Sequence, residues 1–115
     1  MRNLKFRKRE ATLKIVVLVK DTGCSEYEEY YKKCRRKGEF DANVHFFIDD
    51  NGTIHNAREE GAVAGWVYND NETSVYILAQ SNNQQLTSSQ RHSLMPLLLY
   101  LTHKYPNAEI EERTE

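Results

Sequence analysis

The sequence has little of several features that mark well-known classes of protein. It contains only two cysteines, Cys24 and Cys34, which make neither a disulfide framework nor a C-x-x-C pair. No apolar run approaches the ~20 residues that cross a bilayer, and no signal-peptide core follows the basic N-terminus. We therefore expect a reduced, cytoplasmic protein with two structural thiols and no membrane contact.

The chain also lacks a net charge of either sign, because 16 Lys and Arg face 17 Asp and Glu. Composition therefore gives no reason to expect direct nucleic-acid binding. The charges are nevertheless segregated: residues 1–14 are basic, and the segment from Glu109 to the end is acidic. Such segregation marks either an interaction arm or a solvated terminus, and both interpretations stay open.

Motifs of catalysis are missing as well. The sequence has no G-x-S-x-G, P-loop or G-x-G-x-x-G, and its four histidines (His45, His55, His92 and His103) show no metal-type spacing. Asp49 is explained by turn chemistry, although His45 and His55 could approach each other across a hairpin. The residues alone therefore predict no catalytic residue, no metal site and no cofactor.

What is present is a regular series of strands and helices. Continuous apolar runs predict buried strands at 13–19 and 74–80. Two runs around Asn51-Gly52 predict a hairpin over 44–57 with a type I′ turn. Capping boxes at Ser25 and Glu28, and at Thr87 and Gln90, predict the starts of two helices, the second running to about His103.

The order β-α-β-β-β-α predicts an α/β fold with a central mixed sheet flanked by helices, in one domain over residues 1–115. Within it we expect Leu18 to pack with Val16, Phe46, Ile48 and Val75. The stretch "GWVYND", 65–70, places Trp66 and Tyr68 in a loop, where they either bind a ligand or cover the core.

Three segments together resemble a known family. They are "VHFFIDDNGTIHNAREEGAVAGW" at 44–66, "FRKREAT" at 6–12 and "LTSSQRHSLMPLLLYLTHKY" at 86–105. This series is similar to the zinc-dependent N-acetylmuramoyl-L-alanine amidases and peptidoglycan recognition proteins. Within that family it resembles the small lysozymes of T-odd bacteriophages, which cut peptidoglycan and also bind and inhibit phage RNA polymerase.

The resemblance implies where the family's functional residues would fall. The first zinc histidine falls at Leu18, the catalytic tyrosine at Val44 and a loop histidine at Trp66, whereas His45 is kept. The second zinc histidine falls near Arg113 or Thr114, and the last ligand and the catalytic lysine fall beyond Glu115. The former substrate groove would then comprise Leu18, Val44, His45, Trp66 and Tyr68.

These substitutions lead us to expect a truncated amidase-like domain that is not an enzyme, because a catalytic zinc needs three protein ligands. We expect it to bind and inhibit a protein partner in the host cytoplasm, either phage or host RNA polymerase or a host defence protein. The expected contact is the basic arm, defined as Arg2, Lys5, Phe6, Arg7, Lys8 and Arg9.

Three alternatives stay open. The former groove could hold a small ligand, such as a muropeptide or a nucleotide-like signal. An amidase site could be rebuilt around His45, His55 and nearby carboxylates. Phe6 could also anchor the arm to the domain instead of contacting a partner.

Overall fold

A five-stranded mixed β-sheet forms the centre of the protein, and the computed structural model describes residues 7–38 and 41–114. The strand order across the sheet is β3-β2-β4-β1-β5, and only the β2–β3 pair is antiparallel. The strands are β1 (Lys14–Lys20), β2 (Phe46–Ile48), β3 (Ile54–Asn56), β4 (Ser74–Gln80) and β5 (Glu109–Thr114). This architecture confirms the predicted fold class.

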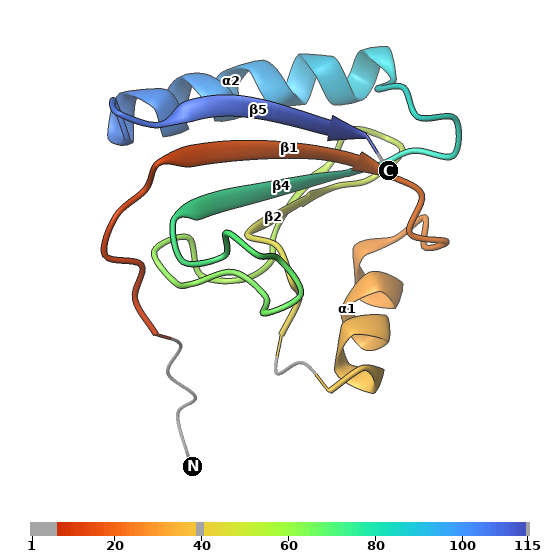
Figure 1. Cartoon of the computed structure of the whole chain (residues 1–115). Helices are drawn as coiled ribbons and strands as arrows, with labels where there is room; N and C mark the ends of the chain where they lie inside the picture. The colour runs from red at the N-terminus through yellow and green to blue at the C-terminus, as the bar shows by residue number, and fades with distance from the viewer. Residues whose placement is uncertain (1–6, 39–40, 115) are drawn as a thin grey trace.

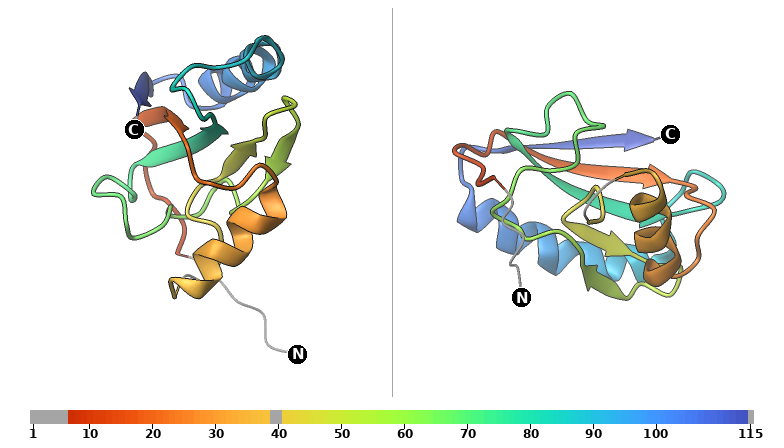
Figure 2. Two further views of the ribbon diagram at one scale, coloured as in Figure 1. Left: turned by 90° about the vertical axis from the view of Figure 1, so that its right-hand side faces the viewer. Right: turned by 90° about the horizontal axis from the view of Figure 1, so that it is seen from below.

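Two helices flank the sheet on opposite sides. α2 (Ser88–Lys104) lies along one face, and α1 (Tyr27–Arg36) lies on the other side, near the end of β1 (Figure 1). Seen along the strands, α2 sits over the β4 and β2 side of the sheet and is offset from β5 (Figure 2). Neither helix among the described residues combines the length and the hydropathy that a membrane span requires.

The inner positions of the central strands β1 and β4 are apolar because both faces of these strands are covered. Alternate residues of β1 enter different cores: Ile15, Val17 and Val19 join the layer beneath α2, whereas Val16 and Leu18 join the layer that includes α1. The expected burial of Leu18 is therefore confirmed, since only 1% of it is exposed.

The expected neighbours of Leu18 were partly wrong. Val16 shares its layer, but Phe46, Ile48 and Val75 lie in the layer on the opposite face. The reason is the two-residue period of a strand, which sends successive side chains to opposite faces. The layer of Leu18 instead contains Phe47, Tyr76 and Leu78.

The predicted hairpin is present, but its turn is not of type I′. That turn needs positive φ at both central residues, whereas here Gly52 has a φ of 85° and Asn51 does not have a positive φ. The Asp49 carboxylate organises a longer turn instead, accepting hydrogen bonds from the backbone N–H groups of Asn51 and Thr53, both at 3.0 Å. Asp49 therefore has the turn role that the sequence indicated.

The helix starts were predicted with mixed success. α2 has the expected capping box, in which the Thr87 hydroxyl accepts from the Gln90 N–H and the Gln90 side chain accepts from the Thr87 N–H. α1 begins after Glu26, which makes no side-chain cap, so the box predicted from Ser25 and Glu28 is wrong. A capping sequence alone does not fix the residue at which a helix starts.

The structure contains one strand more than the predicted order. Residues that the sequence analysis treated as a charged tail form β5, which pairs in parallel with β1 at the edge of the sheet. Its sequence, "EIEERT", has a single apolar residue, so it carries no hydrophobic period from which a strand could be predicted.

Candidate functional site

Leu18 and Arg113 occupy adjacent positions on neighbouring strands. The parallel register of β1 and β5 pairs Leu18 directly with Arg113. These are two of the positions that the resemblance assigned to zinc ligands, so the structure brings the two aligned positions together. Val44, at the position of the family's tyrosine, is fully buried in the same layer as Leu18.

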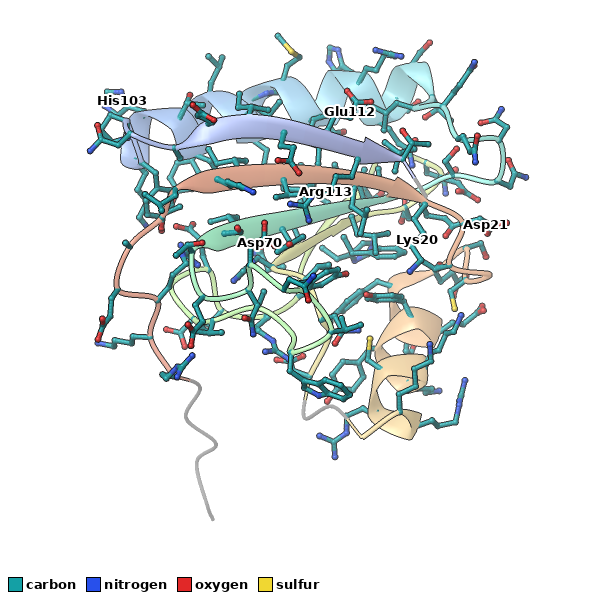
Figure 3. The ribbon with its side chains drawn as sticks, viewed as in Figure 1. Lys20, Asp21, Asp70, His103, Glu112 and Arg113 are labelled. Carbon is teal, nitrogen blue, oxygen red and sulfur yellow. The ribbon has the colours of Figure 1, made fainter. Side chains whose placement is uncertain are left out.

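Arg113 is held by a set of hydrogen bonds that we call the Asp70 network. Its Nη2 donates to the Asp70 carboxylate at 2.7 Å, its Nη1 donates to the Tyr76 hydroxyl at 2.9 Å, and its Nε donates to Glu111. The Tyr76 hydroxyl also donates to Asp70, and Lys14 approaches Asp70 at 3.3 Å. The network ties β5 to β1, β4 and the 65–73 loop, and Asp70 and Arg113 are labelled in Figure 3.

The network determines the charge of Asp70. Burial raises the pKa of this carboxyl, but the hydrogen bonds from Arg113, Tyr76 and Lys14 lower it by more. The resulting pKa lies well below the usual value for Asp, so Asp70 is ionised throughout the neutral range.

The side chains at these positions do not fit a zinc ion. Leu18 has no donor atom, and Arg113 is a cation whose donors are already engaged with Asp70, Tyr76 and Glu111. Zinc takes Cys, His, Asp or Glu ligands, and no group of three or more such side chains comes together in the described part of the chain. These two side chains therefore offer no ligand to a zinc ion.

His45 is fully buried, and its ring forms hydrogen bonds with backbone groups in the core. Its Nδ1 accepts from the backbone N–H of Tyr76 at 3.0 Å, and its Nε2 lies 2.8 Å from the carbonyl oxygen of Ala62. The two partners require a neutral ring with its proton on Nε2. Burial lowers the pKa of His45 to about 4, which keeps the ring neutral at physiological pH.

An open cavity of about 270 Å³ lies on the side of the sheet that contains Leu18. It is bordered by the end of β1, by α1 and by the 65–68 loop, and we call it the groove cavity. Its walls combine three lysines with three aromatic side chains. Its lining residues are Lys20, Thr22, Tyr30, Lys33, Cys34, Lys37, Asn43, Trp66, Val67 and Tyr68.

The aromatic wall of the groove cavity connects it to the Asp70 network. Tyr68 stacks on Tyr76 with ring centroids 4.0 Å apart and an interplanar angle of 15°. Tyr30 is 6% exposed, and burial raises the pKa of its hydroxyl well above the usual value. Trp66, by contrast, is 72% exposed, so most of the indole is available for contact.

Two polar groups of the groove cavity bear on ligand binding. Lys33 Nζ donates to the Thr22 carbonyl at 2.7 Å, which uses one of its three N–H groups. The side-chain oxygen of Asn43 is buried and has no hydrogen-bond partner among the described residues. An unsatisfied buried acceptor of this kind costs free energy and requires an explanation.

His55 is placed apart from His45. Its Nε2 lies 3.0 Å from the Asp49 carboxylate, and its ring stacks on Tyr27 with centroids 5.3 Å apart. His45 instead contacts Ala62 and the backbone of Tyr76. The contacts of the two histidines thus do not join them into one site.

The described end of the basic arm is attached to the domain. Arg7 accepts at its carbonyl from Val63 N–H, at 2.8 Å, and Arg9 N–H donates to the Gly61 carbonyl, at 2.7 Å. The guanidinium of Arg9 donates to backbone carbonyls and lies 5.2 Å from the centre of the Tyr105 ring. Lys8 is exposed, whereas Arg2, Lys5 and Phe6 lie outside the described residues.

Sequence reasoning missed most of the polar residues of this face. Asp70, Tyr76 and Arg113 come from three separate segments, and only the strand register brings them together. Lys33 and Lys37 could have been found, since they are four residues apart at the C-terminal end of α1, where Lys37 is the residue that caps the helix. Nothing in the sequence indicated that Lys20 would join them.

Comparisons with known proteins agree with this geometry, although no family profile matches the sequence. The endolysin of Klebsiella phage KP32 is 30% identical over 94% of this chain and 78% of its own length. The endolysin of Escherichia phage T7 is 29% identical over 100% of this chain and 83% of its own.

Solved structures share the fold at lower identity. The N-acetylmuramoyl-L-alanine amidase LysC from Clostridium intestinale superposes with a TM-score of 0.77 at 20% identity, covering 95% of this chain and 78% of LysC. The peptidoglycan recognition protein PGRP-Hd from Alvinella pompejana gives 0.76 at 14% identity, covering 100% of this chain and 79% of its own.

The fold is therefore that of the N-acetylmuramoyl-L-alanine amidases and peptidoglycan recognition proteins. Within that class, the chain belongs to the family of phage endolysins.

Membership of this family corrects one prediction. The sequence analysis expected a protein that is not an enzyme, on the ground of substituted ligand positions. Relatives that match over almost the whole chain are named endolysins, and structural neighbours are named amidases, so that prediction is wrong. Its weakness was to infer the class of protein from aligned single positions, although a fold and its site are separate properties.

Proposed function

We propose that this protein binds the peptide part of peptidoglycan in the groove cavity. The observation that carries the proposal is the composition of that cavity, in which Lys20, Lys33 and Lys37 surround an aromatic wall. Stem peptides of peptidoglycan carry free carboxylates, which lysine ammonium groups bind through charge-assisted hydrogen bonds.

The other walls suit the rest of such a ligand. Tyr68 and the exposed Trp66 offer flat apolar surfaces for an aliphatic side chain or a sugar face. The names of the relatives, endolysin and peptidoglycan recognition protein, support the same ligand class.

The test is retention of the protein by insoluble peptidoglycan in a pelleting assay, with soluble muropeptides as competitors. We expect Lys37→Ala and Trp66→Ala each to weaken binding by about tenfold, or roughly 1.4 kcal/mol. Lys32→Ala is the matched control, because Lys32 is a lysine of the neighbouring α1 that does not line the cavity. Release of muropeptides into the supernatant, measured in the same samples, reports amidase activity separately.

Two results would overturn the proposal. One is the absence of any retention of the wild-type protein at low salt. The other is binding that Lys37→Ala and Trp66→Ala leave unchanged while the variants remain folded.

A second candidate function is binding to a protein partner, and we propose the basic arm as its contact. The supporting observation is that backbone hydrogen bonds fix Arg7 and Arg9 beside Gly61 and Val63, which displays the exposed Lys8 on the surface. The candidate partners are phage or host RNA polymerase, or a host defence protein, met in the host cytoplasm.

This second candidate is tested with purified polymerase. Immobilised wild-type protein and a variant with Arg2, Lys5 and Arg7 changed to alanine are compared at low and moderate salt. If the arm contributes, the wild-type protein should capture less polymerase at moderate salt than at low salt. The variant should capture less polymerase than the wild-type protein. Equal capture by both proteins at both salt concentrations would exclude the arm as the interface.

A further inference from the structure

The surface beside α2 exposes apolar side chains, in an area that we call the apolar ledge. It consists of Met95 and Leu99 on α2 and Ile110 on β5, which are 61%, 67% and 51% exposed. Apolar side chains that lie together at this level of exposure mark interaction surfaces more often than singly scattered ones do.

Helix geometry places these residues together. Ser93 and Tyr100 point toward the hairpin side of α2, since Ser93 donates to the Gly52 carbonyl and Tyr100 donates to Glu60. With 3.6 residues per turn, Met95 then lies on the opposite flank, toward β5, and Leu99, one turn further on, lies opposite the buried Leu94, Leu97 and Leu101 and points away from the sheet. Ile110 faces the same layer, because it pairs in register with Ile15, whose side chain lies beneath α2.

The charges around the ledge are separated into two halves. α2 contains Arg91, His92, His103 and Lys104 but no acidic residue. On the strand side, Glu112 faces the α2 layer through its register with Val17. His103 and Glu112 are labelled on these two elements in Figure 3.

The charges nearest the ledge have no partner within the domain. Among the described residues, the side chains of Arg91, His103 and Glu112 make no hydrogen bond or ion pair. The ledge thus presents an apolar centre between an unpaired cation, Arg91, on the helix side and an unpaired anion, Glu112, on the strand side. A surface of this pattern is complementary to itself after a twofold rotation.

We propose that the apolar ledge is the interface of a symmetric dimer, with a second copy of this chain as its occupant. A twofold axis parallel to α2 lays the basic helix of each copy over the acidic strand of the other. Met95, Leu99 and Ile110 then form a shared apolar centre, and Arg91 and Glu112 lie at its rim. Rim charges of opposite sign steer association and fix the register of the two copies.

The size of the apolar ledge determines the affinity that we expect for the dimer. α2 is about 25 Å long and β5 about 20 Å long, so that side by side they present on the order of 500 Å² per copy. This is at the low end for specific interfaces, so we expect a dimer that dissociates in the micromolar range.

The experiment is sedimentation velocity of the full chain from low micromolar to submillimolar concentration. We expect the mass to rise with concentration from the 13.5 kDa of one chain toward twice that value. Leu99→Glu should keep the protein monomeric. Val67→Glu is the matched control, since Val67 is 56% exposed but lines the groove cavity, and it should leave the dimer intact.

A charge exchange tests the arrangement of the two halves. Glu112→Arg should weaken the dimer through repulsion, and adding Arg91→Glu to it should restore the wild-type affinity. A wild-type protein that stays monomeric at submillimolar concentration overturns the proposal. A dimer that Leu99→Glu does not weaken, or a double exchange that fails to restore the dimer, overturns it as well.

Discussion

At the scale of single residues, Leu18 is an apolar side chain in an apolar, buried layer. It lies on the face of β1 that packs in the α1 layer, together with Tyr76 and Leu78, and only 1% of it is exposed. Leu18→His should lower the free energy of unfolding by about 1–3 kcal/mol, because a buried imidazole without partners is not compensated for its lost hydration. Urea denaturation measures the change.

Leu18→Met is the control for that variant, since it conserves volume and polarity and should cost less than about 1.5 kcal/mol. A Leu18→His protein as stable as wild type would mean that the ring finds a partner, and would contradict the described packing.

Asp70 stabilises the fold through its charge. Because its pKa is lowered in the folded state, its contribution is present above the pKa of an unfolded Asp, about 4, and is lost as pH falls toward the folded value. Asp70→Asn should cost about 1.5–3 kcal/mol at neutral pH and flatten the acid dependence below pH 4.

The exposed pair between Arg7 and Glu72 provides the comparison for Asp70. Both side chains are more than half exposed, so Glu72→Gln should change stability by less than about 1 kcal/mol. Equal effects of the two substitutions would show that the Asp70 network adds nothing beyond a surface ion pair.

His45 should produce a separate pH dependence at higher pH. Its pKa is about 4 in the folded protein, against about 6.5 unfolded, so the unfolded state binds the proton first as pH falls. Stability should therefore drop by roughly 3 kcal/mol between pH 7 and pH 4. The free energy of unfolding, measured across this range, should depend less on pH in His45→Gln than in wild type. The exposed His92→Gln should keep the pH dependence of wild type.

At the scale of elements, Gln90 connects α2 to the sheet. Its side-chain oxygen accepts from the Thr87 N–H, while the two N–H groups of its Nε2 are shared among the carbonyls of Ile48, Asp49 and Gln80. Gln90→Leu should lower the free energy of unfolding by more than Thr87→Ala, which removes only the cap at about 1 kcal/mol, because Gln90→Leu removes the cap partner and both N–H donors to the buried carbonyls. The order of the two urea midpoints tests this, and the reverse order would refute it.

The same elements show what the sequence could and could not predict. β1, β4 and α2 were predicted within a residue or two, because their apolar patterns and the box at Thr87 are local signals. β5 was missed, since its pairing with β1 stabilises it and no local pattern does. The Asp70 network was missed for a related reason, because it exists only once distant segments are in register.

At the scale of the whole molecule, the groove cavity and the apolar ledge lie on opposite layers of the sheet. Binding at one should therefore be independent of binding at the other. We expect Leu99→Glu to retain the wild-type affinity for peptidoglycan, and Trp66→Ala to retain the wild-type mass at every concentration. A loss of both properties in either variant would indicate unfolding or coupling, which a circular dichroism spectrum separates.

The pairing of β1 with β5 places the first and the last strand of the described chain side by side (Figure 1). During synthesis, β1 leaves the ribosome before the other four strands, and β5 leaves it after them. One edge of β1 therefore stays open while the rest of the sheet assembles, and an open strand edge can join a neighbouring nascent chain. Fast translation of the segment after α2 should thus favour a soluble product.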